Sequence, residues 1–144
     1  MTSGVGYLSG YLNPDFSDGI KEISVLGLAH IGDAVFELMV RTWLCSRGAA
    51  TAKKLHGGSV GFVSAKAQAA AAGRILPSLS EAEMAVFRRG RNARVNSTPR
   101  GSSYEEYHFA TGVEALFGYL YLIGRKDRVE ELFELVINEQ GMDK

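Results

Sequence analysis

The chain has almost none of the residues that cross-link a protein covalently. Among its 144 residues there is a single cysteine, Cys45, so an internal disulfide bond is impossible. A metal site built from thiolates is not expected either, because no second cysteine lies nearby. Free cysteines usually behave as small apolar side chains, and we therefore expect Cys45 to be buried. A chain without disulfides fits a reducing cytoplasm.

Long apolar runs are also missing. No run approaches the ~20 residues that a membrane helix needs, so no membrane span is expected. Residues 1–13 are rich in glycine and lack a signal peptide's basic start and apolar core, so we expect a flexible arm and no export. The chain shows no strand pattern, no internal repeat and no domain linker. These absences predict one compact all-α domain over residues 1–144, with about six helices.

Capping and turn residues place these helices along the chain. Gly48 is expected to cap the first helix, and Gly57 with Gly58 to end a short second one. Ser80 and Glu83 have the spacing of a capping box at the start of the fourth helix. The expected helices span residues 20–46, 51–56, 59–76, 80–87, 104–123 and 126–138.

The net charge is zero, but the basic residues are concentrated in the middle of the chain. Residues 38–104 carry eleven basic and two acidic side chains, a net charge of +9 between flanking segments of −4 and −5. Such asymmetry favours a polyanionic partner. Residues 88–103, RRGRNARVNSTPRGSS, contain five arginines among glycine, proline, serine and asparagine, and we expect a basic loop there.

The side chains of this loop are suited to phosphate. Arginine binds phosphate through a planar fork of donors and keeps its charge. No aromatic residue interrupts the loop, so stacking on single-stranded bases is not indicated, and contacts along a duplex backbone fit better. A solvated loop without a ligand remains the alternative. The expected phosphate-binding residues are Lys66, Arg88, Arg89, Arg91, Asn92 and Arg94.

An acidic stripe runs along the otherwise apolar helix expected around residues 23–44. Spacings of three and four residues place these polar side chains on one helical face, and Gly32 removes side-chain bulk beside them. The stripe consists of His30, Asp33, Glu37 and Arg41. Pairing of Glu37 with Arg41 is one explanation, and a weaker one is a metal-dependent hydrolase of small nucleotides built on His30 and Asp33.

The helix expected over residues 104–123 repeats this pattern. Glu114 lies on a stripe with Thr111 and Gly118 among core-like neighbours. If the two helices pack together, Asp33 and Glu114 face each other, and two buried carboxylates repel unless a proton or a cation neutralises them. Oxygen ligands with room for water suit Mg²⁺ or Mn²⁺. A structural ion pair of Glu114 with a lysine remains the alternative.

Four segments of the chain occur in the order found in a known family. The run GLAHIGDAVFELMVR resembles the signature helix of the ribonuclease III family, and it is followed by FVSAKAQA, RRGRNA and ATGVEALFGYLYL. Together these segments are similar to the short mini-ribonuclease III branch, which lacks an appended double-stranded-RNA-binding domain. The similarity covers roughly residues 20–138.

The resemblance implies an all-helical, homodimeric endoribonuclease of the cytoplasm that cuts double-stranded RNA. It implies Mg²⁺-dependent hydrolysis that leaves 5′-phosphate and 3′-hydroxyl ends, and maturation of the large-subunit (23S) ribosomal RNA precursor, with a ribosomal protein as a further candidate partner. Asp33 and Glu114 match the family's catalytic, metal-binding acids. Larger members have acids where this chain has Ala29 and Thr111. The main rival from another class is a non-catalytic, duplex-RNA-binding or ribosome-associated helical module.

The reduced acid set leaves room for supporting residues. With fewer carboxylates, the metal shell needs water, RNA phosphate or Thr111 to complete it. Glu37 is a candidate supporting acid one turn beyond Asp33, although its pairing with Arg41 is an equally good explanation.

Overall fold

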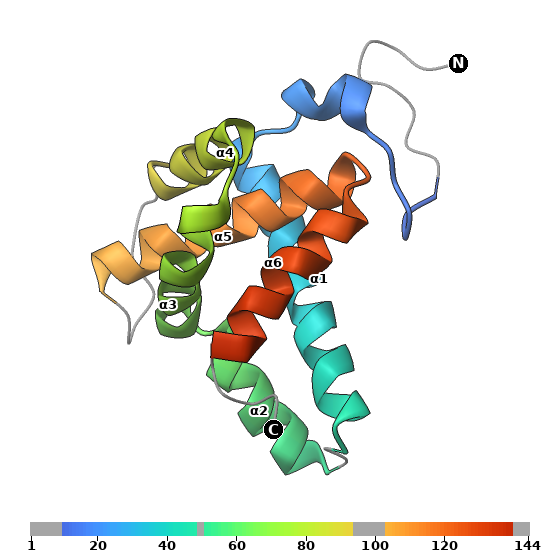
Figure 1. Cartoon of the computed structure of the whole chain (residues 1–144), viewed down its shortest axis with the longest axis vertical. Helices are drawn as coiled ribbons and strands as arrows, with labels where there is room; N and C mark the ends of the chain where they lie inside the picture. The colour runs from blue at the N-terminus through green and yellow to red at the C-terminus, as the bar shows by residue number, and fades with distance from the viewer. Residues whose placement is uncertain (1–9, 49–50, 94–102, 140–144) are drawn as a thin grey trace.

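The computed structural model describes residues 10–48, 51–93 and 103–139, and every regular element in these ranges is helical. The all-α prediction is therefore confirmed (Figure 1). None of the described helices is long and apolar enough to span a membrane. The helices are α1 (Val25–Ser46), α2 (Ala52–Val63), α3 (Ala65–Ile75), α4 (Glu81–Arg91), α5 (Tyr104–Leu122) and α6 (Lys126–Glu139), with 3₁₀ turns η1 (Ser17–Glu22) and η2 (Leu76–Ser78).

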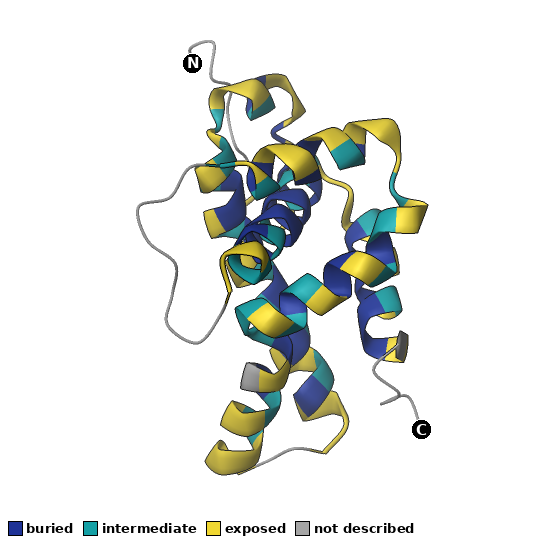
Figure 2. Ribbon diagram, turned by 90° about the vertical axis from the view of Figure 1, so that its left-hand side faces the viewer, coloured by how far each residue is buried: buried dark blue, intermediate teal, exposed yellow. Residues whose placement is uncertain are grey.

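Helix α5 lies at the centre of the bundle. Its apolar residues fall on all sides of the helix, and eleven of its nineteen residues are buried. Helices α1, α3 and α4 pack along it and α6 also contacts it, and dark blue, buried segments gather at the centre of the bundle in Figure 2. The core around it includes Phe36, Phe117 and Phe133, whose rings pack edge to face with centroids 5.4 and 5.8 Å apart.

Glycines allow α1 and α5 to touch backbone to backbone. A Cβ atom on Gly32 would overlap the carbonyl oxygen of Glu114, and one on Gly118 would overlap the carbonyl oxygen of Leu28. Neither backbone atom can move aside without disturbing its own helix, so both positions require glycine. The same contact places Asp33 of α1 beside Glu114 of α5.

A second pair of glycines joins α4 to α5. A Cβ atom on Gly90 would lie 2.9 Å from the carbonyl oxygen of Thr111, and one on Gly112 would lie 2.7 Å from the ring of Phe87. This close approach brings the C-terminal turn of α4 against the N-terminal half of α5.

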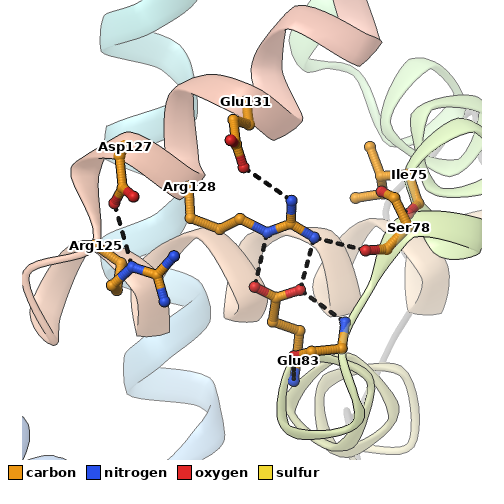
Figure 3. A network of polar contacts seen from close by, with 8 residues as sticks. Ile75, Ser78, Glu83, Arg125, Asp127, Arg128 and Glu131 are labelled. Carbon is orange, nitrogen blue, oxygen red and sulfur yellow. Dashed lines mark hydrogen bonds and ion pairs between the residues drawn. The ribbon is translucent and has the colours of Figure 1, made fainter.

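A buried ion pair fixes α4 to α6, and Figure 3 shows its network. Arg128 donates two hydrogen bonds to the Glu83 carboxylate, of 2.8 and 2.9 Å, and one of 2.6 Å to the carbonyl oxygen of Ser78. The Glu83 carboxylate also accepts from the backbone N–H of Ser80 at 2.9 Å, and the Ser80 hydroxyl accepts from the N–H of Glu83, which confirms the capping box. Each oxygen of the buried Glu83 carboxylate thus accepts at least one hydrogen bond.

Three expected helix boundaries were wrong. Helix α1 begins at Val25, with the Ser24 hydroxyl accepting from the N–H of Gly27, because η1 occupies the preceding residues. Helix α2 continues through Gly57 and Gly58, where the absence of a side chain on Gly58 lets Leu44 pack closely. The expected break at Ser59 occurs instead at Ser64, which caps α3.

The basic loop and the cysteine also differ from expectation. Residues 88–91 form the last turn of α4 and not a loop. The helix continues past Phe87 because Gly90 packs closely against α5. The rest of the expected loop, residues 94–102, lies outside the described residues, as do residues 1–9 of the expected arm. Cys45 is exposed, since helical phase turns Leu44 toward the core and Cys45 toward a groove between α1 and α2.

Gly118→Ala should destabilise the protein strongly, because its methyl group would meet the backbone of α1. We expect a loss of roughly 3 kcal/mol or more in the free energy of unfolding, measured with urea. Gly73→Ala is the matched control: Gly73 is exposed within α3, and a Cβ there meets no atom within 4 Å. It should stabilise by roughly 0.5–1 kcal/mol through helix propensity alone. Equal effects at the two sites would contradict the close-contact interpretation.

Candidate active site

Asp33 and Glu114 meet where α1 crosses α5. Asp33 is exposed on α1, whereas Glu114 is half-buried on α5 between helices of the core. Burial, the charge of Asp33 and a hydrogen bond with Asp33 together raise the pKa of Glu114 from 4.5 to about 8, and burial is the largest of these causes. The sequence expectation that these two acids face each other is confirmed, and their chemical role remains a prediction.

A third polar side chain, that of Gln68 on α3, joins the pair, and it was not predicted from the sequence. Gln68 is fully buried and lies close enough to the Glu114 carboxylate to oppose the rise in its pKa. The sequence gives only a weak indication that Gln68 belongs to the site. On α3 the buried stripe consists of Gln68, Ala71, Ala72 and Ile75, so a single amide interrupts an otherwise apolar helical face.

The residues of this site fit a divalent cation with a partly aqueous shell. Among the described residues, Glu114 forms no ion pair with a lysine or arginine, so the structural explanation is not supported. Two carboxylates and an unpartnered buried amide present oxygen atoms, which hard cations prefer. No group of three or more His, Cys, Asp or Glu side chains gathers in the described ranges. Asp33 and Glu114 would therefore be the charged ligands, with water or phosphate oxygens completing the shell.

Three other polar residues of the two stripes have partners within their own helices. The guanidinium of Arg41 donates to the Glu37 carboxylate, with its Nε 3.0 Å away, so the expected ion pair is present one turn beyond Asp33. The Thr111 hydroxyl donates to the carbonyl oxygen of Tyr107 at 3.0 Å. His30 is exposed. A supporting role of Glu37 or Thr111 toward a metal stays a prediction.

The expected phosphate-binding residues are only partly gathered. Arg88 and Arg89 are exposed on the last turn of α4, and the Nε of Arg91 lies 3.3 Å from the side-chain oxygen of Asn92. Cations at a helix C-terminus also offset the helix dipole, which is a purely structural benefit. Lys66 is exposed on α3 but shares a groove with Glu105 and Glu106, on a different face of that helix from Gln68. Arg94 lies outside the described residues.

Comparisons with known proteins assign the chain to a family. The model of the ribonuclease III domain matches residues 26–125, which include α1, α5 and both acids. A mini-ribonuclease 3 from Clostridium tetani is 41% identical over 89% of this chain and 86% of its own length. One from a Thermoanaerobacter species is 44% identical over 83% of this chain and 84% of its own.

The fold comparison agrees with the sequence comparison. A crystal structure of a protein from Fusobacterium nucleatum superposes with a TM-score of 0.77 at 28% identity, and the match covers 84% of this chain and 97% of that one. The residues that the family model matches span both crossing helices and the paired acids between them. The chain therefore belongs to the ribonuclease III family of endoribonucleases, in the group of the mini-ribonucleases.

Proposed function

We propose that this protein is a Mg²⁺-dependent endoribonuclease that hydrolyses double-stranded RNA and leaves 5′-phosphate and 3′-hydroxyl ends. The observation that supports this best is the meeting of Asp33 and Glu114 at a crossing that two glycines make possible. Glu114 lies in a half-buried position that disfavours a second negative charge, and a cation resolves this conflict.

The chain's own carboxylates would prepare the reaction by holding a divalent cation at a fixed place. Asp33 and Glu114 would hold Mg²⁺, with Mn²⁺ as a substitute, between the exposed face of α1 and the buried axis α5. When bound, such an ion lowers the pKa of a coordinated water and offsets negative charge on a phosphodiester. The glycine contact fixes the spacing of the two helices, so the two carboxylates need little rearrangement to bind the ion.

The basic end of α4 would hold the duplex. Arg88 and Arg89 are exposed, and α4 packs against α5 at Thr111, one turn before Glu114. Phosphates bound at the C-terminal end of α4 would therefore lie beside the N-terminal half of α5, the half that contains Thr111. Further phosphate contacts would come from Arg91, Asn92 and Arg94, and Lys66 on α3 would add another positive charge.

A groove beside α1 supports the homodimer. Its volume is about 370 Å³, and an exposed apolar face of α1 meets α5 and α6 there. Leu38 in this groove is 59% exposed and Leu12 is 81% exposed, so two exposed leucines adjoin an apolar lining, as is typical of a surface that a partner covers. We propose that a second copy does so, since two sites related by a twofold axis would cut both strands of a duplex. The apolar lining includes Ile31, Val35, Leu38, Met39, Tyr121 and Val129.

The proposed substrate is a stem of the large-subunit (23S) ribosomal RNA precursor, processed in the cytoplasm, where a ribosomal protein could present it. A duplex requirement fits the basic end of α4, because its arginines offer contacts to the backbone rather than to unstacked bases.

Asp33→Asn and Glu114→Gln should each lower the cleavage rate of a ribosomal-precursor stem by roughly a thousandfold or more, because each removes a charged ligand. The assay follows the stem with and without Mg²⁺, and circular dichroism checks that each variant keeps its helices. Arg41→Gln is a control on the same face of α1 and should retain most activity. Binding of the stem without Mg²⁺-dependent cutting by the native chain would favour the non-catalytic module.

The metal-free protein should lose stability as the pH rises from about 5 to about 9. The pKa of Glu114 is raised on folding from 4.5 to about 8, so the folded chain binds more protons than the unfolded chain in this window. The contribution of Glu114 is complete below pH 4.5 and is lost as the pH passes 8, a change on the order of a few kcal/mol.

Urea unfolding in EDTA at several pH values measures this loss, and Glu114→Gln is the comparison, because its amide does not titrate. The variant should give the flatter profile, and Mg²⁺ should stabilise the native chain most at high pH. Parallel profiles for the two proteins would show that Glu114 does not titrate between pH 5 and pH 9.

Removing two arginines should weaken binding to duplexes of any sequence. For Arg88→Ala with Arg89→Ala, the slope of log affinity against log salt should fall in magnitude by about 2, one for each lost phosphate contact. Fluorescence anisotropy with a labelled duplex, without divalent metal, gives the slope. Lys21→Ala with Arg125→Ala removes two other exposed cations and should leave it unchanged. An unaltered slope in the α4 variant would identify its arginines as solvated residues.

A further inference from the structure

Gln68 is an exceptional buried side chain in this fold. It lies in the middle of α3 and is 0% exposed, yet neither its Nε2 nor its Oε1 has a hydrogen-bond partner among the described residues. Leaving both ends of a buried amide unpaired is costly, and folded proteins rarely do so without a functional reason. The other buried residues of the α3 stripe are Ala71, Ala72 and Ile75, so an apolar side chain would serve packing equally well.

The position of Gln68 indicates what its amide is for. Helix α3 packs against α5, and the Gln68 side chain approaches the Glu114 carboxylate. It lowers the pKa of that carboxyl, whereas burial and Asp33 raise it. Gln68 therefore presents an unpartnered amide directly beside a candidate ligand of the cation.

We propose that Gln68 is a positioning residue of the cation site: once a hydrated divalent cation is bound between Asp33 and Glu114, its Nε2 donates to the Glu114 carboxylate and its Oε1 accepts a hydrogen bond from a water of that cation. This inference rests on the proposed function, because it requires a cation between Asp33 and Glu114. With only two carboxylates, most of the cation's shell is water, and those water molecules need acceptors. A carboxamide suits this position because one end donates and the other accepts, without adding a third negative charge.

Gln68→Met separates this role from a merely structural one. Methionine has a similar length and no amide, so it removes both unpaired polar atoms from the core. In EDTA the variant should unfold at a higher urea concentration than the native chain. Its affinity for Mn²⁺, measured on the whole chain without RNA from the electron paramagnetic resonance signal of free Mn²⁺, should fall roughly tenfold or more. If Gln68 only fills space, the substitution would change the urea concentration of unfolding and leave the Mn²⁺ affinity unchanged.

Gln68→Glu tests the same position in the opposite direction. It keeps the shape of the side chain but adds a third carboxylate beside Asp33 and Glu114. The metal-free variant should be less stable than the native chain, and its Mn²⁺ affinity should rise roughly tenfold or more, because hard cations favour additional carboxylate oxygens. Ser59→Ala is the control: Ser59 is a buried polar residue of α2 that lines the groove between α1 and α2, and its loss should not alter Mn²⁺ affinity.

The outcomes distinguish the inference from the proposed function. Native-like Mn²⁺ affinity in both Gln68 variants, with binding by the native chain, would overturn the positioning role and leave the proposed nuclease intact. Absence of Mn²⁺ binding by the native chain, with and without a duplex, would overturn the cation site itself. If Gln68→Met binds Mn²⁺ more weakly and is also more stable to urea, the Gln68 amide strengthens cation binding and lowers the stability of the fold.

Discussion

The rest of the structure depends on the contact between the backbones of α1 and α5 at Gly32 and Gly118. Only glycine fits there, because a Cβ at either position would overlap a carbonyl oxygen of the other helix. The contact has two effects. It brings the apolar faces of both helices close enough to form one core around Phe36 and Phe117, and it sets two carboxylates side by side at the edge of that core. Stability and site geometry therefore have the same origin, and neither glycine can change without affecting both.

Much of this arrangement could be predicted from the sequence because it is local. Two nearly all-apolar helices, each with an acid and a glycine on one face, predict that Asp33 faces Glu114 if the helices pack together, and the structure shows that packing between α1 and α5. Capping residues are equally local, and the Ser80 capping box was confirmed. The ordering of four motifs then placed the chain in its family.

What could not be predicted depends on contacts between distant segments. Gln68 is unremarkable within α3, and only the packing of α3 against α5 places its amide beside Glu114. Gly58 looked like a helix terminator, but contact with Leu44 keeps α2 continuous. For Gln68 and Gly58, tertiary packing decided between two local possibilities. Cys45 is a different case: it was assigned to the core by the general behaviour of cysteine, whereas the local helical phase of α1 places it on the exposed side.

The two glutamates that enter the core have opposite electrostatic surroundings. Glu83 meets Arg128 in a fork of two hydrogen bonds, and this pairing lowers the pKa of Glu83. Glu114 has only another acid and an amide beside it, and its pKa is raised to about 8. The charge of Glu83 is neutralised within the fold by Arg128. Among the described residues, no cationic side chain forms an ion pair with Glu114. A fold that can pair one acid so completely does not lack the means to pair the other, and this contrast between Glu83 and Glu114 supports the proposed role of Glu114 as a ligand of a divalent cation.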